Sequence, residues 1–288
     1  MDFVTVSVFL RDRPLHEGNP LAVFADAADM PQDRMQAISR TLNLSETTFV
    51  TGIDKDSYDV RIFTPNEELP FAGHPTIGTT WVLRNLGRIA GNRLTQRSPA
   101  GTTPIRVDDD VIWFSRTGSS SKDLAESDAA AHQRVADALR IDGSDVGMEG
   151  AALGGSGELR VAYSDGGIEQ LMVPLKNEDA LARCRPDATA LRELTPYGVY
   201  CFTGVGPGKL SARGFFAPVG IEEDPATGSA AAALGVYLGA RVGKAELEIA
   251  QGVEMGRPSL IRLRATPDGV EVGGSTRLIY RGRLEVAG

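Results

Sequence analysis

Polar side chains stand directly before two apolar, helix-favouring runs of this sequence. His74 precedes Pro75 in HPTIGTTWVL, and Asp224 precedes Pro225 in EDPATGSAAAAL. Proline is common at the first position of a helix, so the pattern predicts His74 and Asp224 at the N-caps of two helices. Capping alone would explain both residues. A helix start also offers unpaired N–H groups and a partial positive charge, which bind anions such as a carboxylate.

The two motifs are parts of a longer internal repeat. Residues 61–78 read RIFTPNEELPFAGHPTIG and residues 213–228 read RGFFAPVGIEEDPATG, with Arg, Phe, Pro and a final Pro-x-x-Gly in the same order. Such self-similarity indicates two halves built on one plan. When the upstream Thr-Gly pairs are aligned as well, Glu46 falls opposite Gly198. The first half therefore carries an acid that the second half lacks.

Each copy of the repeat also carries an arginine close to a carboxylate. Arg61 with Glu68 and Arg213 with Glu223 are predicted to form structural ion pairs, and contact with an anionic substrate is the alternative for either arginine. The run of alanines after EDPATGS predicts a helix that is buried on all sides, because small side chains let a sheet close tightly around it.

The hydrophobic pattern predicts a mixture of strands and helices. Alternation predicts strands at 2–9, 21–24, 45–50, 58–63, 159–163, 169–174, 198–203, 246–250, 260–264, 269–273 and 278–286. Helical spacing predicts helices at 31–42, 74–87, 129–140, 177–183, 187–194 and 225–240. The polar, serine-rich stretch 117–128 predicts a domain boundary.

Composition excludes several classes of protein. The net charge is -8 and the 30 basic residues are scattered, which argues against a nucleic-acid partner. No apolar run is long enough to span a membrane and no signal peptide is evident, so we expect a cytoplasmic protein. The 3 histidines and 2 cysteines show no metal-ligand spacing, and Cys184 and Cys201 are expected to be buried thiols without assigned chemistry.

The ordered motifs of this chain resemble those of the phenazine biosynthesis PhzF-like family, which is related in fold to diaminopimelate epimerase and proline racemase. The motifs are GNPLAVF at 18–24, NLSETTFV at 43–50, the two repeats at 61–78 and 213–231, and QGVEMGRPS at 251–259. The resemblance implies an α+β fold of two similar halves, each a β-barrel-like sheet around one central helix, with the active site in the cleft between them.

In such folds the C-terminal strand returns to the first half. The resemblance therefore implies a first domain of residues 1–117 plus 275–288, with Glu46 and His74. The second domain is then 118–274, with Asp224 and Ser229.

The resemblance also implies the functional residues. Glu46 matches the catalytic acid/base, and His74 and Asp224 match groups that hold the substrate and assist proton movement. The predicted substrate-binding residues are Asn19, Gly73, Gly228 and Ser229. The racemase relatives carry a cysteine at the start of each central helix. This sequence has none there, which disfavours racemisation by two bases.

These features together predict an isomerase that needs no cofactor or metal. Glu46 would move a proton between two carbons of a small carboxylate, and burial would raise its pKa towards neutrality. The best-known substrate of the family is trans-2,3-dihydro-3-hydroxyanthranilic acid. The alternatives are an epimerase or other acid–base enzyme, with Asp224 as the second proton donor, and a small-carboxylate binding protein without activity. Relatives are commonly homodimers, and we expect the same here.

Overall fold

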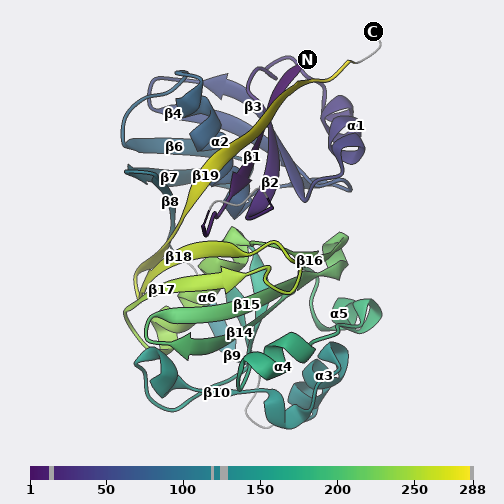
Figure 1. Ribbon diagram of the computed structural model, residues 1–288, viewed down its shortest axis with the longest axis vertical. Coiled ribbons are helices and arrows are strands. Elements are labelled where there is room, and N and C mark those ends of the chain that lie inside the picture. The colour runs from purple at the N-terminus through teal and green to yellow at the C-terminus, as the bar shows by residue number, and fades with distance from the viewer. Residues whose placement is uncertain (13–15, 118–119, 124–128, 286–288) are drawn as a thin grey trace. The chain divides into compact units, whose positions relative to one another are not determined.

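The structure, a computed structural model, describes residues 1–12, 16–117, 120–123 and 129–285. The chain forms two compact units (Figure 1). The first unit comprises Met1–Ser115 together with Gly273–Gly288, and the second comprises Arg116–Val272. Each unit mixes strands with helices, so the predicted α+β class is confirmed.

In the first unit, a sheet curves around the central helix α2 (Gly73–Asn85) (Figure 1). α2 packs on β1, β2 and β3, and α1 (Gln32–Leu42) packs on β3 and β4. The strands are β1 (Asp2–Val8), β2 (Asn19–Phe24), β3 (Glu46–Ile53), β4 (Ser57–Phe63), β5 (Glu68–Leu69), β6 (Arg93–Ser98), β7 (Gly101–Asp108), β8 (Val111–Arg116) and the C-terminal part of β19 (Gly269–Arg283).

In the second unit, the central helix is α6 (Gly228–Arg241), which packs on β9, β12, β13, β17 and β18. The strands are β9 (Ser120–Asp123), β10 (Met148–Glu149), β11 (Glu158–Leu159), β12 (Ala162–Asp165), β13 (Glu169–Pro174), β14 (Val199–Gly206), β15 (Lys209–Phe216), β16 (Ile221–Asp224), β17 (Ala245–Gln251) and β18 (Ser259–Thr266). The other helices are α3 (Ala129–Leu139), α4 (Glu178–Arg183) and α5 (Ala188–Leu194), with short 3-10 helices at Gly143–Asp145, Gly150–Leu153 and Ala217–Val219.

The repeat seen in the sequence reappears in the strand pairing. In the first unit β2–β3 is parallel, β3–β4 antiparallel, β4–β6 parallel and β6–β7 antiparallel. The second unit follows the same order, because β13–β14 is parallel, β14–β15 antiparallel, β15–β17 parallel and β17–β18 antiparallel. The two units therefore share one plan.

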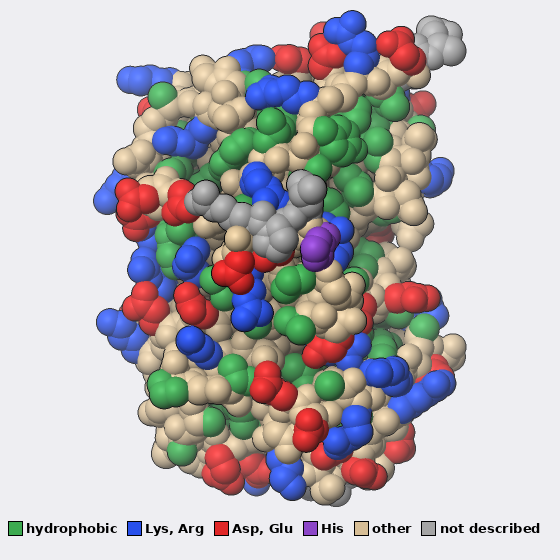
Figure 2. Space-filling view, in the orientation of Figure 1, with side chains coloured by type: hydrophobic (Ala, Val, Ile, Leu, Met, Phe, Trp, Pro, Cys, Tyr) green, Lys and Arg blue, Asp and Glu red, His purple; other side chains and the backbone are tan. Residues whose placement is uncertain are grey.

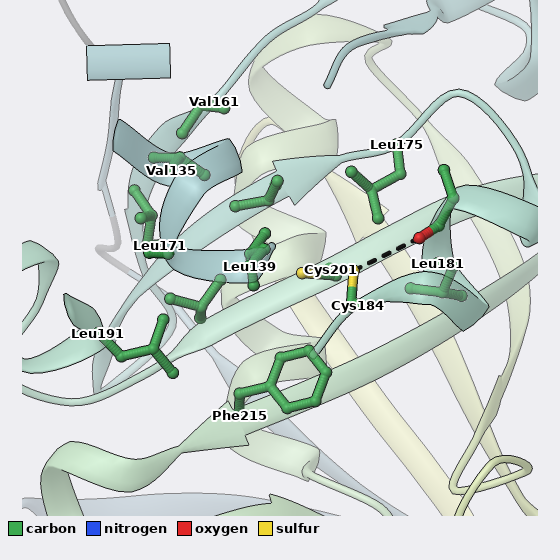
Figure 3. Packing of buried hydrophobic residues seen from close by; sticks show 14 of the residues in the cluster. Val135, Leu139, Val161, Leu171, Leu175, Leu181, Cys184, Leu191, Cys201 and Phe215 are labelled. Carbon is green, nitrogen blue, oxygen red and sulfur yellow. Dashed lines mark hydrogen bonds between the residues drawn. The ribbon is translucent and has the colours of Figure 1, made fainter. Parts of the chain in front are cut away.

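Both faces of the second unit's sheet are covered. α6 is buried from Gly228 to Gly235 and again from Tyr237 to Gly239, which confirms the burial predicted for the alanine run. A hydrophobic cluster packs β13 and β14 against α3, α4 and α5 (Figure 3). It includes Leu139, Leu171 and Leu191. This burial fixes β13 and β14, the strands that lead towards the polar motif at the start of α6.

The prediction that His74 and Asp224 cap the two central helices is wrong. Ala72 is the N-cap of α2, so His74 lies within its first turn. Pro75 is tolerated there because N–H groups of the first turn have no partner within the helix. Thr227 is the N-cap of α6, and Asp224 is the last residue of β16. The chain stays extended at Asp224 because that residue pairs with Gly214 of β15.

The strands predicted at 269–273 and 278–286 belong to one strand, β19, which ends at Arg283, and residue 286 lies outside the described residues. Gly273 and Gly274 lie inside this strand, where glycine is generally unfavourable. They are needed for packing instead: a Cβ at Gly273 would lie 2.5 Å from the Trp113 ring, and one at Gly274 would overlap Phe9. Beyond these glycines β19 pairs antiparallel with β1 of the first unit.

Charges of both signs are interspersed over β14–β18 on the face that Figure 2 shows.

Within the described residues, no helix is long and apolar enough to cross a membrane.

The predicted ion pairs are present in both units. Arg61 donates to both carboxylate oxygens of Glu68, at 2.7 and 2.5 Å, and Arg213 donates to both oxygens of Glu223, at 2.8 and 2.9 Å. Each guanidinium also lies over a phenylalanine ring, Phe63 at 5.3 Å or Phe215 at 4.8 Å. The Arg213 side chain is 6% exposed and the Arg61 side chain 27%.

Arg213 has further partners, because its Nη1 donates to the carbonyls of Leu181 and Cys184 at 3.1 and 3.0 Å. We expect Arg213→Met to reduce the unfolding free energy by about 3 kcal/mol, since it leaves a carboxylate and two carbonyls unpaired in the interior. Arg61→Met, the matched control, is expected to cost about 1 kcal/mol because its pair is partly solvated. Urea denaturation measures the unfolding free energy of both variants. Equal losses in the two variants would contradict the prediction that the more deeply buried pair contributes more to stability.

Candidate active site

Three of the predicted site residues lie together in the first unit. β2 and β3 are parallel neighbours, with Leu21 opposite Glu46, so their first residues meet at one edge of the sheet. Asn19 begins β2, Glu46 begins β3 and His74 lies in the first turn of α2. Glu46 Oε2 is 3.6 Å from His74 Nε2, and Asn19 Nδ2 is 3.3 Å from His74 Nδ1. All three residues are buried.

Burial keeps the His74 imidazole neutral. Desolvation lowers the pKa of His74 to about 3, and a hydrogen bond with the Pro20 backbone opposes that shift. Proline has no N–H, so its carbonyl accepts this bond from the imidazole. Among the described residues Nε2 has no hydrogen-bond partner, and it faces the Glu46 carboxyl group.

The start of α2 is held by a buried polar network. The first helical hydrogen bond runs from Thr76 N to the Ala72 carbonyl, so the N–H groups of Gly73 and His74 precede the helical ladder. Gln96 Nε2 donates to Thr76 Oγ1 at 3.0 Å, and Tyr58 Oη donates to Gln96 Oε1 at 3.0 Å. Burial raises the pKa of Tyr58, so its hydroxyl remains a donor.

The second unit holds Asp224 in a comparable network. Thr227 Oγ1 donates to Asp224 Oδ2 at 2.6 Å. Gln251 Nε2 donates to the Asp224 carbonyl at 2.8 Å, and Gln251 Oε1 accepts from Thr227 N at 3.2 Å and from Tyr200 Oη at 2.9 Å. Burial, followed by the nearby Asp224 carboxylate, raises the pKa of Tyr200. The turn between β16 and α6 is therefore fixed by side chains.

The first turn of α6 presents backbone donors. Its first helical hydrogen bond runs from Ala231 N to the Thr227 carbonyl, so the N–H groups of Gly228, Ser229 and Ala230 precede the ladder. Ser229 is buried, with 7% of its surface exposed. These groups and the helix dipole suit a carboxylate.

The residues that support the two helix starts were not predicted from the sequence. They are Tyr58, Thr76 and Gln96 in the first unit, and Tyr200, Thr227 and Gln251 in the second. Gln251 begins the motif QGVEMG, so one signal was present in the sequence. Gln96 stands in RLTQRS, where nothing distinguishes it from a polar residue on a solvated strand. In the structure, complete burial shows that Gln96 is not on a solvated face of the strand.

Position 198, which aligns with Glu46, has no room for a side chain. A Cβ on Gly198 would overlap the Phe216 ring and lie 3.0 Å from Gln170 Oε1. A Cβ on Gly214 would lie 2.6 Å from the same ring. Phe216 thus sits against two glycines, and it replaces the Thr64 of the first repeat. The second unit fills with a phenyl ring the position that carries an acid in the first.

Within the described part of the chain, no group of three or more His, Cys, Asp or Glu side chains could hold a metal ion. Glu46 and His74 alone would supply too few ligands for the four-coordinate sites typical of zinc.

The comparisons with known proteins agree on one family. The sequence model described as phenazine biosynthesis-like protein matches residues 6–282. The trans-2,3-dihydro-3-hydroxyanthranilate isomerase of Pseudomonas fluorescens is 37% identical, over 93% of this chain and 94% of that protein. The Pseudomonas aeruginosa protein of the same name is 36% identical over 98% of each chain. The crystal structure of a PhzF-family protein from Bacillus anthracis shares the fold, with a TM-score of 0.83 at 24% identity over 99% of both chains.

The packing of Phe216 can be tested with a double-mutant cycle. We expect Gly198→Ala to reduce the unfolding free energy by about 2 kcal/mol, because the added methyl group overlaps the ring. In a Phe216→Ala background the same change is expected to cost nearly nothing. Urea denaturation of the four proteins measures the coupling. Additive effects would show that Phe216 does not fill the space at Gly198.

The neutral state of His74 predicts a pH dependence of stability. The unfolded chain binds a proton on this imidazole below about pH 6.5, whereas the folded protein does so near pH 3. Stability from His74 is complete above the unfolded pKa and falls as the pH decreases through this window. From about pH 7 to about pH 4.5 we expect the wild type to lose about 2 kcal/mol more than His74→Gln.

His132→Gln is the matched control, because His132 lies partly exposed on α3 of the other unit. Urea denaturation at several pH values should show a wild-type slope in His132→Gln and a shallower slope in His74→Gln. Parallel slopes in all three proteins would contradict the assignment of a neutral, buried His74.

Proposed function

Because the chain belongs to the phenazine biosynthesis-like protein family, we propose that Glu46 catalyses an allylic 1,3-proton shift on a small carboxylate. The protein is an isomerase, as its relatives are named. Two of those relatives are named for trans-2,3-dihydro-3-hydroxyanthranilate, and we propose the same ring compound as the substrate of this chain.

Glu46 would act as base and then as acid. Its carboxylate removes a proton from a carbon that is activated by conjugation, and the same carboxyl group returns the proton to another carbon on that face. A single acid is sufficient for both steps. The observation that supports this assignment most directly is the packing at Gly198, where Phe216 leaves no space for a second acid at the corresponding position.

His74 would orient the substrate while its imidazole remains neutral. Nε2 of the neutral imidazole would form a hydrogen bond with an amino or hydroxyl group of the substrate. Nε2 lies 3.6 Å from Glu46 Oε2, so a donor bound there is held next to the acid. Asn19, in contact with the same imidazole, would line this position.

Binding of the substrate carboxylate is assigned to the helix starts. In the first unit the backbone N–H group of Gly73, and in the second that of Gly228 with the Ser229 hydroxyl, would each be able to donate to a carboxylate. Negative charge develops on the substrate when the proton leaves, and fixed donors that face this charge lower the barrier. Asp224 of the second unit would accept from an amino or hydroxyl group of a substrate. Its orientation is supported by the hydrogen bond from Thr227.

The assignment is tested with trans-2,3-dihydro-3-hydroxyanthranilic acid in D2O, with carbon-bound protons followed by NMR. We expect the wild type to convert the compound and Glu46→Gln to lower the rate by about a thousandfold, because an amide cannot accept the proton. Glu67→Gln is the matched control, since Glu67 is exposed in the same unit. Full turnover by Glu46→Gln would refute the mechanism.

The same experiment distinguishes the two alternatives. Entry of solvent deuterium with inversion at one carbon would identify an epimerase, in which Asp224 is the second proton donor. Thermal stabilisation by the compound without conversion or exchange would identify a binding protein. In either case Glu46 would not be the base of a 1,3-shift.

We also propose that the protein is a cytoplasmic homodimer that works without cofactor or metal. Size-exclusion chromatography with light scattering tests the dimer, and activity that survives prolonged treatment with a chelator tests the absence of a metal requirement. A monomeric mass or a loss of activity would contradict the respective statement.

A further inference from the structure

The two cysteines of the chain lie next to one another in the second unit. Cys184 directly follows α4, and Cys201 lies on β14. Both are fully buried in the hydrophobic cluster between the sheet and the outer helices, and Figure 3 shows their sulfur atoms close together. The Cys184 thiol lies 3.5 Å from the Ala180 carbonyl, the hydrogen bond drawn in Figure 3, and each thiol shifts the pKa of the other. Two residues 17 positions apart in sequence thus form a dithiol.

The surroundings of the two thiols differ. The hydrogen bond from Cys201, followed by the charges of Arg213 and Arg185, lowers the pKa of Cys184. Burial, followed by the hydrogen bond to Cys184, raises the pKa of Cys201. The thiolate is the reactive form of cysteine, so Cys184 is the better nucleophile of the pair and Cys201 remains a thiol.

A pocket leads towards Cys184. Its volume is about 330 Å³, and Cys184 lines it together with the arginines Arg140, Arg185 and Arg213 and the side chains of Leu191 and Phe215. Cys184 is 0% exposed. Even a small reagent such as water or hydrogen peroxide can therefore reach its sulfur only when the residues that line the pocket open locally. Cys201 does not line the pocket.

We propose that Cys184 and Cys201 are a peroxide-sensitive pair that hydrogen peroxide converts into an intramolecular disulfide. The Cys184 thiolate attacks one oxygen of hydrogen peroxide, which breaks the O–O bond and gives a sulfenic acid and hydroxide. The Cys201 thiol then attacks that sulfur, the S–O bond breaks, and water leaves with the thiol proton. In total, two electrons pass from the two sulfurs to the peroxide. The hydroxide takes up the proton that Cys184 lost on forming the thiolate, so the peroxide yields two water molecules.

The formation of the disulfide is tested on the wild-type protein. The folded protein is treated with millimolar hydrogen peroxide, quenched with catalase, unfolded and alkylated with iodoacetamide before peptide mapping. We expect a linked pair of peptides that contains Cys184 and Cys201, has lost two hydrogen atoms and regains both alkylatable thiols after treatment with dithiothreitol. Oxidation of Met255, which is 37% exposed, shows that the peroxide is active.

Single variants identify the order of events. In Cys201→Ser we expect the sulfenic acid at Cys184 to persist and to be trapped by dimedone. In Cys184→Ser we expect at least about tenfold less dimedone adduct, because Cys201 lacks the features that favour the thiolate. Each variant is compared with wild type by circular dichroism, to exclude reaction of unfolded protein.

Several results would overturn the proposal. Two alkylatable thiols in the peroxide-treated wild type, while Met255 is oxidised, would show that the pair does not react. A disulfide between two chains would show that the pair does not resolve internally. A dimedone adduct on Cys201 in preference to Cys184 would reverse the assigned roles. None of these measurements uses the isomerase activity, so they are independent of the function proposed above.

Discussion

The fold depends on placing the start of a helix inside the protein without leaving its polar groups unsatisfied. The first N–H groups of a helix have no partner within it, and they are costly to bury. Each unit supports its helix start with a buried glutamine, Gln96 or Gln251, whose amide group bonds to a threonine beside the helix start and to a tyrosine hydroxyl. The N–H groups of Gly73 and Gly228 precede the helical ladders. The helix starts that we propose to bind a carboxylate are therefore the ones that buried side chains hold in place.

The two units show how one plan supports two different roles. Both keep the glutamine network and the ion pair of an arginine over a phenylalanine. They differ where chemistry is concerned, because Glu46 of the first unit is matched by Gly198, with Phe216 packed against it, in the second. An acid at position 198 would require a second substitution, at Phe216, because the Phe216 ring occupies the space beside Gly198 and Gly214. The asymmetry is therefore built into the packing of the second unit.

Much of this could be predicted from the sequence because it depends on local signals. The repeat, the buried alanine helix and the ion pairs follow from periodicity and spacing, and the α+β class follows from the resemblance to a known family. The predicted caps failed because Pro75 and Pro225 look alike, although the first lies within a helix and the second in an extended turn. That difference is set by the pairing of Asp224 with Gly214, a contact between strands. Gln96 and Phe216 were missed for the same reason, since their partners are distant in sequence.

The state of His74 constrains any mechanism that uses this site. With its pKa lowered to about 3 by burial, the imidazole is neutral. Burial disfavours the charged imidazolium, which argues against His74 as the general acid. In the proposed mechanism, the proton that leaves the substrate would remain with the carboxyl group of Glu46 until it is returned. Retention on one residue, 3.6 Å from His74 Nε2, would favour transfer between two carbons on one face over inversion at a single carbon.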